Sequence, residues 1–392
     1  IEFGKELRGK QKVSIVKSDE TSSSYLIPKG KHINFNQGEV IKKGELPHKS
    51  LNIILKKIVA SLEKLFSNYL ITYHVRPAIS SNFKTISLTN SIPETAVIIQ
   101  GPINKNKNFT LETIKIYKKL FPKSLIILST WDNESEATLR KFSDLEIKIV
   151  TSSMPKNNPL RNTGWISTDL HLISARAGIE CAMQNSTKYC LKTRTDQRFY
   201  RPDLIEYFLK LQEIFPLNLD TNQNQRLITS SFITPKYRVY GLTDMVMFGE
   251  INDIYNYWSV EKYSTGIFNY MDSETDEIPP IISGTLVGAE VYFMSSYLKQ
   301  LGEDLDWTLK HYWKMLGEYF LVVDGTSIDT YWDKYNKGSE YKFGRDYSSK
   351  AHRLLDFMDW VQLYSGENIK WDTLRDQEKW VRSNGKLVRL LV

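Results

Sequence analysis

Short apolar runs alternate with amphipathic segments between residues 95 and 150. Strands are predicted at residues 96–99, 125–128 and 147–150, where Ile, Val and Leu dominate. Helical spacing separates these strands over about residues 110–121 and 134–141. The repetition of strand, helix and strand predicts a parallel sheet. Right-handed crossovers would then place all of the strand ends at one edge of that sheet.

A long helix predicted at residues 163–184 continues this pattern. Further strands are predicted from Tyr189 onward and at residues 227–229 and 245–249, and another helix is predicted at residues 286–300. The chain is therefore predicted to have an α/β fold, an αβα sandwich in which a mostly parallel central sheet lies between helices.

The two ends of the chain lack this regular pattern. Residues 1–90 are rich in Lys, Ser and Gly, apart from an apolar helix face at 50–66. Residues 331–392 are rich in Trp, Tyr and charges, and apolar positions over 354–361 predict a helix packed on the main body. We therefore predict a small accessory region over 1–90, a main domain over 91–330, and a helical and aromatic C-terminal extension.

Charged residues follow the predicted strand that begins at Tyr189. Where this strand is expected to emerge from the sheet stand Lys192, Arg194, Asp196 and Arg198. Unpaired charges are costly in a packed core, and ligands of open α/β sheets bind at the carboxyl ends of the strands. The cluster therefore predicts a site for an anionic ligand such as a nucleotide diphosphate.

This cluster offers two ways to hold a diphosphate. Asp196 can bind a divalent cation, Mn²⁺ or Mg²⁺, together with diphosphate oxygens. Alternatively, Arg194 and Arg198 supply positive charge without a metal. A purely structural Arg–Asp pair is the third interpretation.

Other polar residues at the predicted strand ends are candidates for donor binding. Gln100 offers an amide to a base edge, and Gly101, which precedes Pro102, allows a ligand to approach the backbone closely. Trp131 can stack on a base, and Asp132 can accept hydrogen bonds from ribose hydroxyls. An ordinary turn with a half-buried Trp is the alternative at these positions.

Four further residues have candidate roles. Arg161 and Asn162 precede the long helix, whose N-terminus can hold a phosphate. Asp244 precedes an apolar strand and Glu290 stands on an apolar helix, so each is a candidate general base for an acceptor hydroxyl. A capped helix start, a turn cap and a paired carboxylate are the respective structural alternatives.

Composition narrows the function classes. The 392 residues carry a net charge of +7, which favours anionic partners such as nucleotides, phosphorylated glycans or lipid surfaces. P-loop and Gly-x-Gly-x-x-Gly motifs are absent, and we expect no nucleic-acid partner.

Cys181 and Cys190 are too few for a disulfide framework, which favours the cytoplasm. No apolar run predicts a membrane-spanning helix.

Four segments, taken in order, resemble the WavE-type lipopolysaccharide-synthesis family. They are Ala96–Pro102, Ile126–Trp131, Leu191–Arg198 and Thr243–Gly249. The resemblance spans roughly residues 95–300. It implies a bacterial glycosyltransferase of the GT-A type, which moves a sugar from a nucleotide-sugar donor to a glycan or glycolipid acceptor of lipopolysaccharide, capsule or another surface polysaccharide.

The resemblance also implies positions for several residues. Gln100, Gly101 and Asp132 would face the nucleotide, and Asp196 would occupy the usual acidic position. Arg194 stands where a second acid is usual, so metal use stays open. A lipid-linked acceptor implies work at the inner face of the cytoplasmic membrane, and the basic balance suits a peripheral contact there.

Three alternatives compete with this hypothesis. A transferase that uses a CMP-linked acidic sugar would need no metal. A nucleotidyltransferase is less favoured, because residues 101–108 contain a single Gly. A glycan-binding protein without catalysis would explain Arg194 in the acidic motif. The sequence does not choose the sugar, the acceptor or the stereochemistry.

Overall fold

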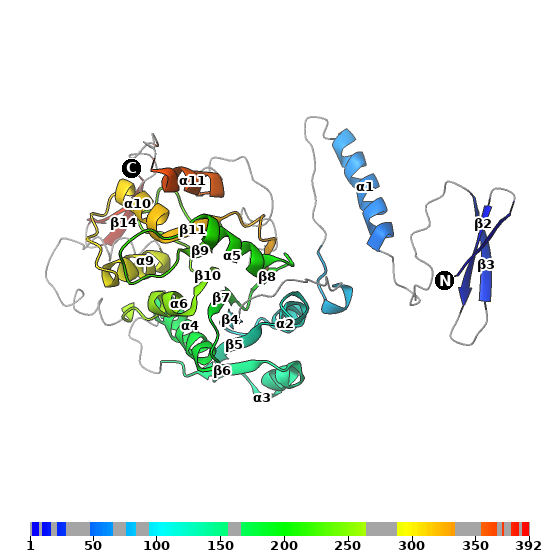
Figure 1. Cartoon of the computed structure of the whole chain (residues 1–392), viewed down its shortest axis with the longest axis horizontal. Coiled ribbons are helices and arrows are strands. Elements are labelled where there is room, and N and C mark those ends of the chain that lie inside the picture. Colours follow the sequence, from blue (N-terminus) through cyan, green and yellow to red (C-terminus); the bar gives the residue numbers. More distant parts are fainter. Residues whose placement is uncertain are drawn as a thin grey trace. The chain divides into compact units, whose positions relative to one another are not determined.

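The chain divides into two compact units, Ile1–Arg76 and Pro77–Val392 (Figure 1). The computed structural model describes residues 2–7, 10–16, 22–28, 48–65, 76–83, 94–155, 166–263, 288–333, 354–366, 371, 378–383 and 386–391. The division falls at residue 77, whereas the sequence placed it near residue 91. The accessory role of the first unit stays a prediction.

The described part of the first unit contains a small antiparallel sheet and one helix. Its elements are β1 (Glu2–Leu7), β2 (Lys10–Val16), β3 (Ser22–Pro28) and α1 (His48–Leu65). Helix α1 matches the apolar helix predicted at residues 50–66.

A seven-stranded sheet forms the centre of the second unit, in the order β11-β9-β10-β7-β4-β5-β6. Strand β10 is antiparallel to both of its neighbours, and the other strands run parallel to one another. The predicted α/β class with a mostly parallel sheet is therefore confirmed. The strands are β4 (Thr95–Gln100), β5 (Leu125–Trp131), β6 (Lys148–Ser152), β7 (Tyr189–Arg194), β9 (Leu227–Ser230), β10 (Met247–Glu250) and β11 (Phe320–Val323).

Helices cover both faces of this sheet (Figure 1). One face carries α4 (Ile166–Gln184), α6 (Ile251–Trp258) and α9 (Ala289–Gln300). The other face carries α2 (Phe109–Leu120) and α5 (Leu204–Ile214). The other described helices of this unit are α3 (Glu136–Leu139), α10 (Leu309–Tyr319) and α11 (Phe357–Ser365), with 3₁₀ turns at Ser80–Asn82, Asn106–Asn108 and Arg140–Leu145.

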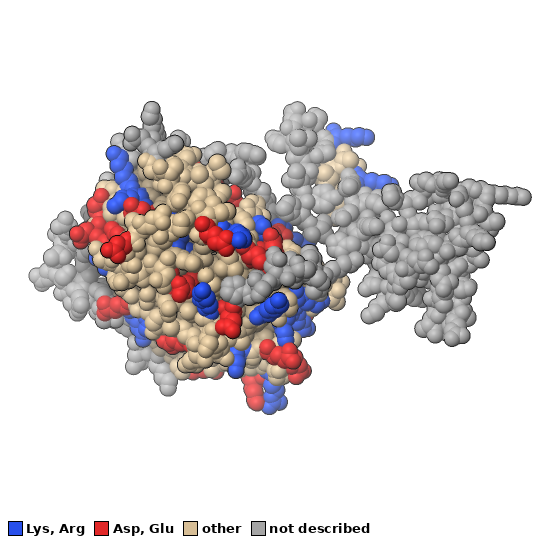
Figure 2. Space-filling model, in the orientation of Figure 1, with Lys and Arg blue, Asp and Glu red and all other residues tan. Residues whose placement is uncertain are grey.

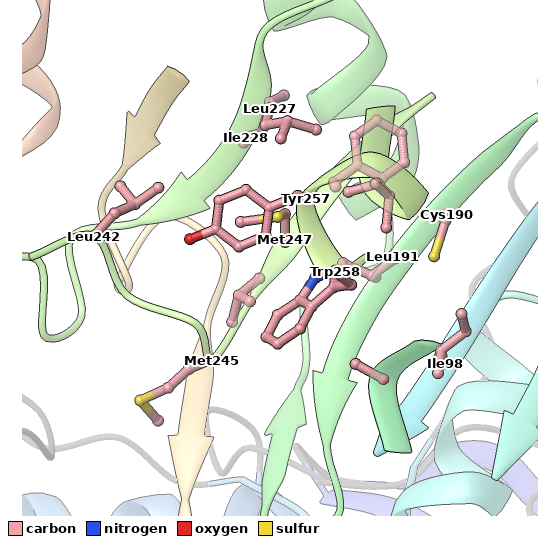
Figure 3. Close-up of a cluster of buried hydrophobic side chains, with 14 of the residues drawn as sticks. Ile98, Cys190, Leu191, Leu227, Ile228, Leu242, Met245, Met247, Tyr257 and Trp258 are labelled. Atoms are coloured by element: carbon pink, nitrogen blue, oxygen red, sulfur yellow. The ribbon is translucent and has the colours of Figure 1, made fainter. Parts of the chain in front are cut away.

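The core lies between the sheet and its helices. Ala96, Val97, Ile98 and Ile99 of β4 are fully buried, as expected for a strand covered on both faces. Tyr257 and Trp258 of α6 point into a cluster of buried side chains that includes Met247 and Leu191 (Figure 3).

Helix α4 packs closely on β4 and β5. A Cβ atom at Gly178 would lie 2.6 Å from Ile98 Cγ2, so only glycine permits this approach. Ser129 Oγ donates to the Ser174 carbonyl, and Gln100 Nε2 donates to Ser174 Oγ, both at 2.6 Å. These contacts hold α4 against the strand ends where the candidate site lies.

The C-terminal segment packs partly on this unit. The predicted tail helix is found as α11, and Trp360 Nε1 donates to the carbonyls of Leu316 and Phe320. Leu354 lies before this helix and forms an isolated bridge with Pro235. The described residues also form two short sheets, β8 (Gln197–Phe199) with β12 (Thr330–Trp332) and β13 (Glu378–Ser383) with β14 (Lys386–Leu391).

Arg198 of β8 lies inside the protein, although the sequence placed it at the donor. It is 1% exposed. Its guanidinium donates to Thr113 Oγ1 through Nε, to the Ala78 carbonyl through Nη1 and to the Phe109 carbonyl through Nη2. This arginine links β8 to α2 and to the start of the unit, so the assignment to donor binding is corrected to a structural role.

We predict that Arg198→Lys lowers the free energy of unfolding by about 2–4 kcal/mol, because an ammonium cannot reach all of these acceptors and leaves buried carbonyls unpaired. Urea unfolding measures this difference. Arg140→Lys is the control, since Arg140 pairs with Glu136 on the exposed surface, and it should change stability by less than about 0.5 kcal/mol. Equal effects of the two substitutions would contradict the structural role.

Candidate functional site

Two cations lie two residues apart on the same face of β7. Lys192 is fully buried, and its Nζ donates to the Asp244 carbonyl and lies 4.1 Å from the centroid of the Trp258 ring. Burial lowers the pKa of Lys192 to about 8. Arg194 follows at the carboxyl end of the strand, in register with Gln100 of β4. Positive charge is thus concentrated beneath α4, α6 and α9.

Arg194 forms a two-pronged ion pair with Asp196. Arg194 Nε lies 2.9 Å from Asp196 Oδ1, and Nη2 lies 3.1 Å from Oδ2. Trp332 Nε1 of β12 also donates to Oδ2, at 2.9 Å. Burial alone would raise the pKa of Asp196, but the hydrogen bonds and charge of Arg194, with the Trp332 indole, hold that pKa below its ordinary value. Asp196 is therefore a paired carboxylate.

This pairing leaves Asp196 poorly suited to hold a divalent cation. Both of its oxygens accept hydrogen bonds from Arg194, and a metal would have to displace them. Among the described residues no group of three or more His, Cys, Asp or Glu side chains could hold a metal ion. The residues present thus do not fit the divalent cation that was one of the alternatives at Asp196.

Asp244 is buried beside a histidine of α4. Its Oδ2 lies 2.7 Å from Nδ1 of His171, and its side chain is 4% exposed. Burial would raise the pKa of Asp244, but the contact with His171 and the charges of Lys192 and Arg194 outweigh burial and lower that pKa far below its ordinary value. Asp244 is therefore an anion that faces two cations of β7 and the imidazole of His171.

Glu290, at the start of α9, is a second acid near Asp244. Burial, followed by the negative charge of Asp244, raises the pKa of Glu290 to about 7. The charges of Arg238 and Arg194 act in the opposite direction. Two acids with pKa values displaced in opposite directions are typical of sites that move protons.

The turn after β4 is fastened to the turn after β7. Gly101 has a φ of 123°, a conformation that favours glycine, and a Cβ there would lie 3.1 Å from Thr195 Oγ1. Thr195 Oγ1 donates to the Pro102 carbonyl at 2.6 Å, and Thr195 N donates to the Gln100 carbonyl at 3.1 Å. The two strand ends expected to form one site are thus adjacent.

The remaining donor-binding candidates lie in different environments. Gln100 is buried with its amide nitrogen bound to Ser174 of α4, and Trp131 is buried at the end of β5. Asp132 is exposed, and its Oδ2 accepts from Ser153 Oγ at 2.6 Å. Arg161 and Asn162 lie outside the described residues. Of these positions, Asp132 presents a side chain to solvent.

The structure adds His171, which was not assigned a role from the sequence, and gives specific contacts to Lys192, which the sequence placed in the charged cluster. His171 joins the site through Asp244, and Lys192 joins it through Trp258 and the Asp244 backbone. Lys192 gave a sequence signal, because a lysine two positions before Arg194 shares its face of a strand. His171 gave none, since its partner lies in a distant segment.

Two further properties of the described residues are the distribution of charge on the surface and the hydrophobicity of the helices. Figure 2 shows acidic and basic side chains interspersed over the visible face of the described part. None of the described helices combines the length and the apolar character that a bilayer-spanning segment requires.

Residues 95–390 match the protein family described as WavE lipopolysaccharide synthesis. This match is longer than the resemblance seen in the sequence, which covers roughly residues 95–300. It also includes the C-terminal extension. The match confirms the predicted family. The predicted enzyme class, glycosyltransferase, agrees with this family.

Curated proteins match over a short segment. The β′ subunit of DNA-directed RNA polymerase from Aromatoleum aromaticum is 46% identical over 46 residues, which are 12% of this chain and 3% of that subunit. The corresponding subunit from Rickettsia akari is 47% identical over 47 residues, with the same shares of 12% and 3%. The chain thus spans about 3% of the length of these relatives.

Solved structures match at low similarity. Core-mannan synthase A from Aspergillus fumigatus, in a Mn/GDP form, is 11% identical with a TM-score of 0.34, over 76% of this chain and 93% of that chain. A cytidylyltransferase from Leptospira borgpetersenii is 13% identical with a TM-score of 0.25, over 46% and 71% of the two chains.

We predict that Glu290→Gln makes the thermal stability of the protein less sensitive to rising pH. The pKa of Glu290 is about 7 in the folded state and 4.5 ordinarily, so the native state holds this proton more tightly than the unfolded state. Raising the pH from about 4.5 to about 7 therefore destabilises the wild type relative to Glu290→Gln. Melting temperatures across this range measure the difference, with the exposed Glu213→Gln as control. Parallel curves for wild type and Glu290→Gln would contradict the raised pKa.

Proposed function

The chain belongs to the WavE lipopolysaccharide synthesis family, and from this premise we propose that it is a glycosyltransferase. It transfers a sugar from a nucleotide-sugar donor to a glycan of lipopolysaccharide or a related surface polysaccharide. The observation that carries the proposal is the grouping of Lys192, Arg194, Asp244 and Glu290 at the carboxyl ends of β4 and β7.

This grouping provides the two functions that sugar transfer needs. The leaving phosphate gains negative charge as the glycosidic bond breaks, and a fixed cation stabilises that charge. Arg194 is placed for this role, because it ends β7, keeps 20% of its side chain exposed and stays protonated. The polar groups around Asp244 and Glu290 serve the acceptor, whose hydroxyl must lose a proton.

Asp196 has a supporting role in this proposal. It holds the Arg194 guanidinium in place through two hydrogen bonds. Arginine thus takes over the charge role that paired acids and a cation have in related enzymes. Gly101 and Asp132 stay as proposed contacts of the nucleotide, at the same edge of the sheet.

A CMP-linked acidic sugar is the second candidate donor. The observation that favours it is the commitment of both Asp196 oxygens to Arg194, because a monophosphate leaving group carries less charge than a diphosphate. Contact with the cytoplasmic face of the membrane, where a lipid-linked acceptor would be met, is part of the proposal.

A thermal-shift screen of UDP-, GDP-, CMP- and dTDP-linked sugars tests the function. A ligand that binds the native state raises the melting temperature by mass action. We expect one nucleotide class to stabilise the protein, to the same extent with manganese and with a chelator. Stabilisation by glycans together with no response to any donor would instead support a glycan-binding protein.

We predict that Arg194→Met weakens binding of the stabilising donor about 10–100-fold, because charge-assisted hydrogen bonds contribute about 1.5–3 kcal/mol. Isothermal titration measures the change. Arg201→Met is a matched control, because Arg201 and Asp203 form the same two-pronged pair with the same spacing, at the start of α5. Unchanged donor affinity in Arg194→Met, or an equal loss in Arg201→Met, would refute the role of Arg194.

A further inference from the structure

We propose that His171 is the general base of the transfer reaction and that Asp244 positions it. The inference rests on the proposed function and assigns its proton-accepting atom, Nε2 of His171. It also predicts the stereochemistry, because a base that activates the acceptor for direct displacement gives inversion at the anomeric carbon.

The geometry of the His171–Asp244 pair determines which nitrogen is available. Asp244 Oδ2 lies 2.7 Å from His171 Nδ1. A carboxylate at this distance favours the proton on Nδ1, which leaves the lone pair on Nε2. No hydrogen bond joins Nε2 to another described residue, and 24% of the His171 side chain is exposed. Within the described part of the chain, Nδ1 thus faces the carboxylate and Nε2 is the nitrogen left for an acceptor hydroxyl.

Asp244 is badly placed to act as the base itself. Its side chain is 4% exposed, so an acceptor hydroxyl has little access to its oxygens. Its pKa is also far below the ordinary value, because His171, Lys192 and Arg194 stabilise the anion. A buried carboxylate that orients an imidazole and stabilises the imidazolium is the arrangement that makes histidine an effective base.

The position of His171 in the fold agrees with this role. It lies one turn before Ser174, the α4 residue that binds Gln100 at the end of β4. The charged groups around the pair are Lys192 and Arg194 from β7 and Glu290 from α9, which interact electrostatically with Asp244, and Phe293 packs at 6.3 Å from the His171 ring. The base is thus beside the cation proposed to meet the donor phosphate.

The proposed step conserves atoms and charge. The acceptor oxygen attacks the anomeric carbon and forms the new glycosidic bond. The bond from that carbon to the donor phosphate oxygen breaks, and its electron pair leaves with the nucleotide. The hydroxyl proton passes to His171 Nε2, and the resulting imidazolium is stabilised by Asp244. No metal or other co-reactant is required.

Steady-state transfer from the stabilising donor to rough lipopolysaccharide tests the proposal. We expect His171→Ala to lower kcat at least about 100-fold, to remove the acidic limb of the pH–rate profile, and to leave the donor-induced thermal shift unchanged. Free imidazole should restore part of the rate. Asp244→Asn should lower kcat, because the imidazolium formed in the reaction loses the carboxylate that stabilises it. The product of the wild type should have the inverted anomeric configuration by NMR.

His311→Ala is the matched control. Nδ1 of His311 in α10 also has a partner, the Tyr240 hydroxyl at 2.7 Å, but His311 lies outside the charged cluster. The His311→Ala variant should keep the wild-type kcat and pH profile. Glu290→Gln tests the competing acid and should keep the acidic limb.

The outcomes separate this inference from the proposed function. A wild type that transfers sugar while His171→Ala keeps its rate and pH profile would overturn the role of His171 alone. A retained anomeric configuration, or loss of the acidic limb in Glu290→Gln and not in His171→Ala, would do the same. A wild type that binds no donor and transfers no sugar would overturn the proposed function and the base together.

Discussion

The burial of positive charge on one face of β7 is the constraint on which the site depends. Strand β7 lies at the centre of a sheet that helices cover, where apolar residues are usual. It carries Lys192 and Arg194 there instead. Buried charges are tolerated only when partners compensate them. The surroundings of β7 supply these partners as the Trp258 ring, the Asp244 backbone and carboxylate, and Asp196. The same compensation arranges acids and cations around a region where an anionic donor can bind.

Helix α4 connects this charged region to the apolar core. Gly178 allows the helix to lie almost directly on Ile98, and Ser174 binds the polar end of β4. His171 stands one turn further toward the start of the helix and contacts Asp244. Because these contacts lie on successive turns of one rigid element, core packing also determines where the imidazole is held. A site supported in this way is positioned more precisely than one built on loops.

The Arg194–Asp196 pair places a self-compensated ion pair at the end of β7. A second acid beside Asp196 would create repulsion that a cation relieves, whereas Arg194 neutralises Asp196 within the protein. The pair is further fixed by Trp332, which arrives from the C-terminal part of the matched region. The segment after residue 330 therefore contributes directly to the site, although its sequence suggested a peripheral addition.

The sequence by itself determined the alternating strands and helices, the family and the charged end of β7, because periodicity and motif order are local properties of the chain. Only the tertiary structure decided which charges face one another. Arg198 follows Arg194 closely in sequence, yet the turn after β7 directs it to α2 and away from the site. His171 and Asp244 come from distant segments and meet only because α4 packs beside β7. Such pairings depend on packing between elements, which no local pattern encodes.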